Sequence, residues 1–338
     1  RMALWTAVGI GLGFGLKTTA VVLAVIPVAA LVLQGRPDAL RLKALAWAIP
    51  LTASLALAST PSLIFATQDW LATMRFENGV VEGTTPVFWT RQFLADSGPL
   101  YQMRQLWGAT EGAGLLLALA GLILMPRRTW RLLLPGLAFA LVYAALTFDW
   151  HAAFFRYLSP LFPVVLVLAG VGAARMAEAL PSRFVSALAW LGLGLIAVNG
   201  LDLAASYQAR DPRILAEAHL VSLAAPGDVV AIEPYDTPLT GGLETVVLPL
   251  DGLDATAIAQ PLAGSDWLLV ASRRNWGVLP GSTMLGCSYY AALVKGELGF
   301  RPVATFRRAS PLGPLLEPGI AGEETRTVFD RPTLILLR

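Results

Sequence analysis

The sequence predicts a polytopic α-helical membrane bundle of about six to seven spans, followed by a small extracytoplasmic α/β domain. Of the 338 residues, 56% are hydrophobic and 14% are charged, and the mean hydropathy is +0.62. An ordinary soluble protein carries about 25% charged residues. The apolar excess lies in residues 1–205, whereas residues 206–338 have the composition of a soluble domain. We therefore predict a transmembrane domain over 1–205 and a water-soluble domain over 206–338.

The apolar stretches of the first domain fit membrane helices. A span needs about 20 mostly apolar residues, and irregular backbone in lipid would leave its polar groups unpaired. The stretch from Met2 to Gln34 is too long for one crossing and carries Lys17 near its middle, where a charge facing lipid is costly. It predicts two short helices that meet at Lys17 and Thr18. The other spans are predicted over 45–66, 110–126, 132–148, 158–174 and 185–203.

The orientation of these spans follows from Lys and Arg in short loops, which mark the cytoplasmic side. Such residues form three groups: Arg36, Arg41 and Lys43; Arg127, Arg128 and Arg131; and Arg175 and Arg183. Alternation of the spans then places a long loop over 67–109, a short loop over 148–157 and the C-terminal domain outside the cytoplasm.

The C-terminal domain alternates short apolar runs with polar turns, which is typical of buried strands. We predict strands over 229–232, 245–248, 267–271, 302–306 and 333–337, and helices over 212–223 and 289–297. This combination favours a small mixed α/β layer domain. His219 lies on the flank of the first helix, and we assign it a structural role.

Charge and cysteine content exclude several classes of protein. The formal net charge of +2 is too small to indicate a nucleic acid or another polyanion as a partner. Cys287 is the sole cysteine, so an internal disulfide and a cysteine-built zinc site are ruled out. We predict membrane lipids as surroundings and no protein-bound metal centre.

The long external loop is rich in aromatic residues and charges from Gln68 to Trp107. One interpretation is an interfacial belt, since Trp and Tyr favour the headgroup level. The other is a helix on the membrane surface that helps to form a pocket for a lipid headgroup and a sugar. The aromatic residues are Trp70, Phe76, Phe88, Trp89, Phe93, Tyr101 and Trp107.

A second polar group surrounds the short external loop. Asp149, His151, Arg156 and Tyr157 lie at the start of a predicted span, and Lys17 could face them across the bundle. Arg binds a phosphate with its fork of donors and Lys binds it as a point charge. We therefore predict phosphate or substrate binding by Lys17, Arg156, Tyr157 and His151. The alternative for Arg156 is snorkelling to the interface.

Several motifs resemble a known family when they are taken in order. In the first domain these are GLGFGLKTTAVVLAVIP (11–27), LWGATEGAGLLLALAGL (106–122) and FRYLSPLFP (155–163). In the second they are SDWLLVASRRNWGVLPG (265–281), YYAALVKGELGFRPVATF (289–306) and FDRPTLILLR (329–338). Their succession resembles the later half of bacterial GT-C membrane glycosyltransferases, the dolichyl-phosphate-mannose protein mannosyltransferase-like and aminoarabinose transferase-like family.

The resemblance implies transfer of a sugar from a polyprenyl-phosphate donor to an acceptor at the outer face of the bacterial inner membrane. It implies that Lys17 and Arg156 face the phosphate, and it leaves a divalent metal open. In the family the base is an acidic residue in the first external loop, a region that precedes the part matched here. We therefore expect the usual carboxylate to be absent from this chain, and a missing N-terminal half to be one possible partner. Substitute bases would be Glu77, Glu82 and Asp96.

Two other functions stay open. A half-bundle has helix faces that must meet lipid or protein, so the chain could be a non-catalytic membrane scaffold or subunit of a larger complex. A transporter is the third alternative, but the sequence offers no inverted repeat and no intramembrane ion-binding carboxylates.

Overall fold

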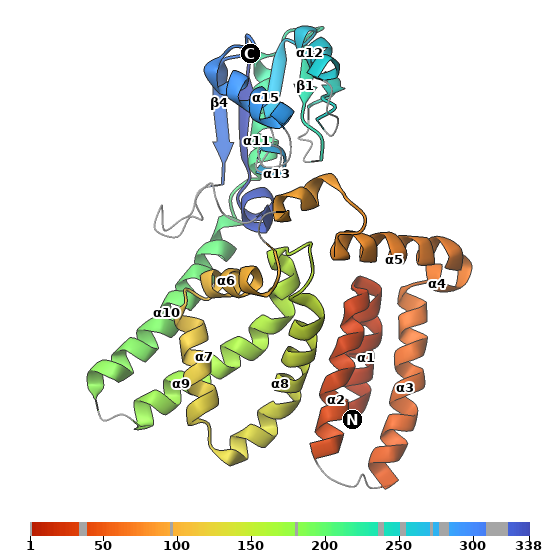
Figure 1. Ribbon diagram of the computed structural model, residues 1–338, viewed down its shortest axis with the longest axis vertical. Coiled ribbons are helices and arrows are strands. Elements are labelled where there is room, and N and C mark those ends of the chain that lie inside the picture. Colours follow the sequence, from red (N-terminus) through yellow and green to blue (C-terminus); the bar gives the residue numbers. More distant parts are fainter. Residues whose placement is uncertain are drawn as a thin grey trace. The chain divides into compact units, whose positions relative to one another are not determined.

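A computed structural model describes most of the chain, shown in Figure 1. The described residues are 2–33, 39–94, 97–179, 182–235, 240–250, 255–270, 273–276, 284–308 and 324–338. The chain forms two compact units. The first contains 1–85, 98–150 and 157–193, and the second contains 86–97, 151–156 and 194–338. Arg36, Asp96 and Ala271, which entered the predictions above, lie outside the described residues.

The first unit is helical throughout its described part. Its helices are α1 (Met2–Leu16), η1 (Thr18–Ala24), α2 (Val25–Leu33), α3 (Ala39–Ser59), α4 (Ser62–Phe65), α5 (Thr67–Glu82), α6 (Pro99–Ala109), α7 (Ala113–Leu124), α8 (Arg127–Thr147) and α9 (Phe162–Ala179). A 3-10 turn, η3 (Phe155–Leu161), precedes α9, and α10 (Arg183–Ser206) runs on from this unit into the second. The predicted break at Lys17 is confirmed, because α1 ends at Leu16 and Lys17 is extended.

Three helical segments within the described ranges are long and apolar enough to cross a membrane. They cover 127–147, 155–179 and 183–206, and α6 with α7 would make a fourth if this pair, bent by 101°, is one span. The protein is therefore mostly helical, with three to four membrane-length apolar helices. Shorter apolar helices cover Leu4–Leu16, Thr18–Leu33 and Ala46–Ser59.

Small residues allow the helices of the first unit to approach closely. Figure 1 shows α1 beside α3, and the Ser59 hydroxyl of α3 donates a hydrogen bond of 3.2 Å to the Gly11 carbonyl of α1. Helices α7 and α9 meet at Gly121 and Gly172, where a Cβ on Gly172 would lie 1.9 Å from the Leu117 carbonyl oxygen. Such close contact lets backbones pack where lipid supplies no hydrophobic driving force between helices.

The second unit is built on a five-stranded mixed sheet with the strand order β2-β1-β3-β5-β4. Its strands are β1 (Val229–Ile232), β2 (Glu244–Val247), β3 (Trp267–Val270), β4 (Pro302–Arg307) and β5 (Thr333–Leu337). β1 pairs in parallel with β2 and β3, whereas β5 pairs antiparallel with β3 and β4. The five predicted strands are confirmed to within about one residue at each described end.

Apolar clusters cover both faces of this sheet. On one face Ala231, Leu268 and Leu337 pack with residues of α12 (Ala255–Ala263) and α15 (Met284–Lys295). On the other face Trp267, Leu336 and neighbouring residues pack against α11 (Pro212–Leu223), where the predicted helix is confirmed. Alternate residues of a strand point to opposite faces, so β1, β3 and β5 each supply both clusters.

Part of the long loop belongs to the sheet unit. The 3-10 helix η2 (Phe88–Phe93) buries Phe88 in the first cluster, and its ring stacks on Tyr235 with 5.5 Å between centroids. The Gln92 side-chain amide donates to the Glu324 carboxylate, which also accepts from Arg274 at 2.9 Å. This buried polar group fixes the segment to the domain.

A second buried polar group follows β1. The Glu233 carboxylate, fully buried, accepts a hydrogen bond of 2.8 Å from the Tyr290 hydroxyl, and the Tyr289 hydroxyl lies 3.4 Å away. Burial, reinforced by the Glu233 carboxylate, raises the pKa of both tyrosine hydroxyls well above the usual value. These contacts stabilise the packing of α15 on the sheet.

Candidate functional site

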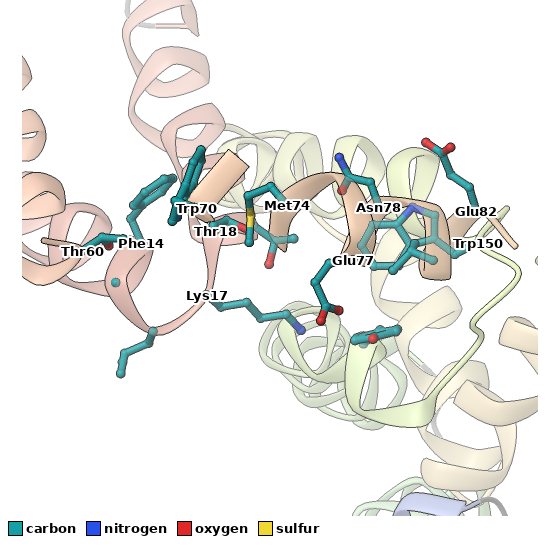
Figure 2. Close-up of a pocket in the computed structure, with 15 residues that line it drawn as sticks. Phe14, Lys17, Thr18, Thr60, Trp70, Met74, Glu77, Asn78, Glu82 and Trp150 are labelled. Atoms are coloured by element: carbon teal, nitrogen blue, oxygen red, sulfur yellow. The ribbon is translucent and has the colours of Figure 1, made fainter. Parts of the chain in front are cut away.

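The first unit contains a cavity of about 480 Å³ beside the break between α1 and η1. This volume lies within the range of about 300–1,000 Å³ that small-molecule sites occupy. Figure 2 shows the side chains that surround it. The lining residues come from the break, from α5 and from the segment that follows α8: Phe14, Gly15, Leu16, Lys17, Thr18, Thr19, Thr60, Trp70, Met74, Glu77, Asn78, Val81, Glu82, Trp150 and Tyr157.

Lys17 reaches the cavity because the helix stops at this residue. Its backbone N–H closes the last turn of α1 on the Gly13 carbonyl at 2.8 Å, and its own carbonyl accepts from the Ala20 N–H at 2.9 Å. Between these bonds the residue is extended, with φ −156° and ψ 122°. In a continuous apolar helix the Lys17 ammonium would face lipid, which is costly. The break lets it point into the cavity instead.

Tyr157 supplies an aromatic surface next to this cation. The Lys17 ammonium lies 4.6 Å from the centroid of the Tyr157 ring, a cation–π distance. The Tyr157 carbonyl accepts a hydrogen bond of 2.9 Å from the buried Tyr143 hydroxyl of α8. Trp150 packs edge-on against the Tyr157 ring with 5.3 Å between centroids. Tyr157 is therefore held at its backbone by Tyr143 and at its ring by Trp150.

Helix α5 forms another wall. Trp70, Met74, Asn78 and Val81 follow one another at helical spacing, so they share one face of the helix, with Glu77 beside them. The helix ends at Gly83, which adopts φ +80°, and the Thr85 N–H then donates to the Gly79 carbonyl at 2.9 Å. A left-handed glycine is the common way to close a helix.

The cavity combines one cation with two carboxylates. Figure 2 shows the Lys17 ammonium and the Glu77 carboxylate pointing toward one another, with Glu82 farther along α5. Lys17, Glu77 and Glu82 are all exposed, so solvent or a ligand can reach them. A site of this kind can hold an anionic group at the ammonium and can accept a proton at a carboxylate.

The predicted site residues are distributed over both units. Lys17 and Tyr157 come together in the cavity, as described above. Arg156 and His151 belong to the second unit, where the Arg156 guanidinium lies 4.1 Å from the Phe154 ring centroid and 6.0 Å from that of Phe329. Phosphate binding by these four residues stays a prediction.

Other lining residues were not singled out from the sequence. Thr18, Met74, Asn78 and Trp150 line the cavity, and Trp70 was noted just as one of many loop aromatics. The sequence signal that could have grouped them was the spacing of Trp70, Met74 and Asn78, which places all three on one face of a helix. Of the substitute bases, Glu77 and Glu82 line the cavity, whereas Asp96 lies outside the described residues.

Within the described ranges, no group of three or more His, Cys, Asp and Glu residues is arranged to hold a metal ion. The question of a divalent metal therefore stays open, as the resemblance left it.

These features define a class: a mostly helical protein with three to four candidate membrane spans, a polar cavity at a helix break, and a C-terminal mixed-sheet domain. Comparison of the chain with protein-family models, with curated proteins and with solved structures gave no match.

Proposed function

We propose that this protein is part of a membrane glycosyltransferase that transfers a sugar from a polyprenyl-phosphate donor to an acceptor at the extracytoplasmic face. In this reaction an acceptor hydroxyl oxygen attacks the anomeric carbon while the bond from that carbon to the phosphate oxygen breaks. The hydroxyl proton passes to a carboxylate, and the polyprenyl phosphate leaves as an anion. Such chemistry needs a cation at the phosphate and a base at the acceptor.

The observation that carries the proposal is the placement of Lys17 at a break in an apolar helix, inside a cavity that also contains Glu77. A lysine in such a stretch is costly unless it serves a polar ligand or a counter-ion. The cavity brings the cation, two carboxylates and several rings within reach of one small molecule. We assign the surface helix expected from the aromatic loop to α5, whose residues line the cavity.

The proposed membrane arrangement has six to seven spans. Beyond the three to four membrane-length helices, it requires that the shorter apolar helices also cross. Thr18–Leu33 has 16 residues, of which seven form the 3-10 helix η1 and nine form α2; at about 2.0 Å and about 1.5 Å per residue they span about 28 Å, against a hydrocarbon layer of about 30 Å. Local thinning of the bilayer accommodates a mismatch of this size.

The proposed location is the bacterial inner membrane, with the C-terminal domain outside the cytoplasm. Fusions after Arg338 test this orientation. Alkaline phosphatase, which is active in the periplasm, should be active there, and green fluorescent protein, which fluoresces when folded in the cytoplasm, should be dark. The reverse pattern would place the domain in the cytoplasm and exclude an external acceptor.

Binding of polyprenyl phosphate tests the proposed function directly. The protein in lipid nanodiscs should bind radiolabelled polyprenyl phosphate, and Lys17→Ala should weaken this binding. Native membranes that contain the protein should transfer sugar from at least one member of a panel of polyprenyl-phosphate hexoses. Absence of both binding and transfer would refute the proposal.

The alternative is a non-catalytic membrane subunit of a larger complex. One observation favours it: α10 exposes large apolar side chains, and 11% of the residues in its most apolar stretch are buried. Such a helix needs lipid or protein around it. Purification in mild detergent distinguishes the two functions. A constant stoichiometric assembly with unrelated subunits, together with no polyprenyl phosphate binding, would favour the subunit.

A further inference from the structure

The cavity extends along helix α5. Trp70 and Glu82 both line it, and their separation of 12 positions corresponds to about 18 Å along the helix axis. In Figure 2 the side chains of Phe14 and Trp70 lie at one end, Lys17 and Glu77 lie in the middle, and Asn78, Glu82 and Trp150 lie at the other end. The cation is therefore placed between two ends of different chemistry.

The first end presents large apolar side chains beside the hydroxyl groups of Thr18 and Thr60. Phe14, Trp70 and Met74 present two aromatic rings and a thioether, and the only hydrogen-bonding side chain among these three is the indole N–H of Trp70. All three are half-buried, so each leaves part of its apolar surface open. Met and aromatic side chains adapt well to an irregular apolar ligand. This end suits the first isoprene units of a lipid chain.

The second end suits a polyhydroxyl group. The Asn78 amide can both donate and accept, and the Glu82 carboxylate accepts from hydroxyl groups. Trp150 adds a flat ring whose negative face attracts the polarised C–H groups on one side of a pyranose. Its edge-on contact with Tyr157 fixes the orientation of this ring.

We propose that Asn78, Glu82 and Trp150 form a sugar subsite of the cavity, and that the donor lies with its lipid chain toward Phe14, Trp70 and Met74. The inference rests on the proposed function, in which Lys17 binds the donor phosphate. It adds the direction in which the donor lies and the residues that hold its sugar.

The test compares two probes on the protein in nanodiscs: polyprenyl phosphate alone, and the same lipid carrying glucose, mannose or another hexose. The sugar should strengthen binding for at least one hexose. Asn78→Ala should reduce affinity for that sugar-bearing probe by about five-fold to ten-fold, the value of one or two lost hydrogen bonds. Affinity for polyprenyl phosphate alone should change by less than about two-fold, since that probe makes no such bond.

Trp150 needs a pair of variants because its ring also supports Tyr157. Trp150→Phe keeps an aromatic face and should retain most of the gain in affinity that the hexose brings, whereas Trp150→Ala should lose this gain. Matched controls outside the cavity are Thr73→Ala on α5 and Trp5→Ala, whose ring is 75% exposed. Both controls should bind the two probes as the unaltered protein does.

The outcomes separate the two proposals. Suppose that polyprenyl phosphate binds and that its binding depends on Lys17. If no hexose then strengthens binding, or if Asn78→Ala leaves the gain in affinity from the hexose unchanged, the sugar subsite is wrong and the proposed function stands. If polyprenyl phosphate does not bind, both fail. A donor analogue with a photoreactive group on its first isoprene unit should label the peptide around Trp70 and Met74. Labelling around Trp150 would reverse the orientation.

Discussion

The ammonium group of Lys17 lies 4.6 Å from the centroid of the Tyr157 ring, although the two residues are 140 positions apart in the sequence. Tyr157 is held at its backbone by the hydrogen bond from the Tyr143 hydroxyl to its carbonyl and at its ring by the contact with Trp150. A cation held over a ring at an exposed site gains about 0.5–1 kcal/mol. The position of the charge is thus set by α8 and the segment after it, as well as by the helix break.

Replacement of Lys17 should weaken phosphate binding. Charged hydrogen bonds contribute about 1.5–3 kcal/mol, so Lys17→Ala should lower the affinity for polyprenyl phosphate by about ten-fold or more. Lys17→Arg keeps the charge and should retain part of the affinity. Lys43→Ala is the charge-matched control, because Lys43 is exposed and does not line the cavity. Equal losses for Lys17→Ala and Lys43→Ala, measured by equilibrium binding, would contradict a specific role.

Replacement of Glu77 should separate binding from chemistry. Its carboxylate faces Lys17 and would repel a phosphate, so Glu77→Gln should bind polyprenyl phosphate at least as tightly as the unaltered protein. If Glu77 accepts the acceptor proton, sugar transfer should fall by about 100-fold or more. Binding and transfer are measured on the same membranes.

The control for this variant is Asp69→Asn, which removes a carboxylate from the same helix outside the cavity. It should change neither quantity by more than about two-fold, since Asp69 does not line the cavity. Full transfer by Glu77→Gln would assign the proton to another group.

The contact between α7 and α9 should not tolerate an added methyl group. The Cβ of Gly172→Ala would lie 1.9 Å from the Leu117 carbonyl oxygen, so the helices must separate. Overpacking costs about 1–3 kcal/mol, and we expect a lower melting temperature in detergent. Gly170→Ala is the matched control on α9, since its Cβ would meet nothing within 4 Å. Equal melting temperatures for both variants would show that the helices do not approach this closely.

The sheet domain should lose stability in acid through Asp228. The hydrogen bond from the Trp267 indole N–H, 2.8 Å long, lowers the pKa of the Asp228 carboxyl, and the Ala225 N–H adds to this effect. Because the folded-state pKa lies below the unfolded value, the stabilisation is present above about pH 4 and disappears as the pH falls through the folded-state pKa.

Asp228→Asn tests this linkage, because an amide does not ionise in this range. Denaturant titrations should show the unaltered protein more stable than the variant at neutral pH, with the difference closing below pH 4. Glu244→Gln, at an exposed residue of β2, is the control for the loss of one carboxylate from the sheet. If the difference in free energy of unfolding between Asp228→Asn and the unaltered protein does not change with pH, the ionised carboxylate is not its cause.

Local pattern accounts for most of the secondary structure predicted from the sequence. The runs at 229–232 and 333–337 became β1 and β5 because short apolar runs between polar turns have few other ways to bury themselves. The short helices α12 and α13 (Arg273–Trp276) were not predicted. Pro261 lies inside α12, and α13 spans four residues, so neither has the length over which helical periodicity is evident.

The sequence by itself determined the apolar helices, the break at Lys17 and the strands of the C-terminal sheet, because each depends on residues that are near one another in the chain. Tertiary structure decided which polar groups meet. Lys17, Glu77 and Tyr157 line one cavity although they come from three distant segments. No periodicity encodes such a meeting, since it depends on how the helices pack, and that packing is set by contacts such as those at Gly11 and Gly172.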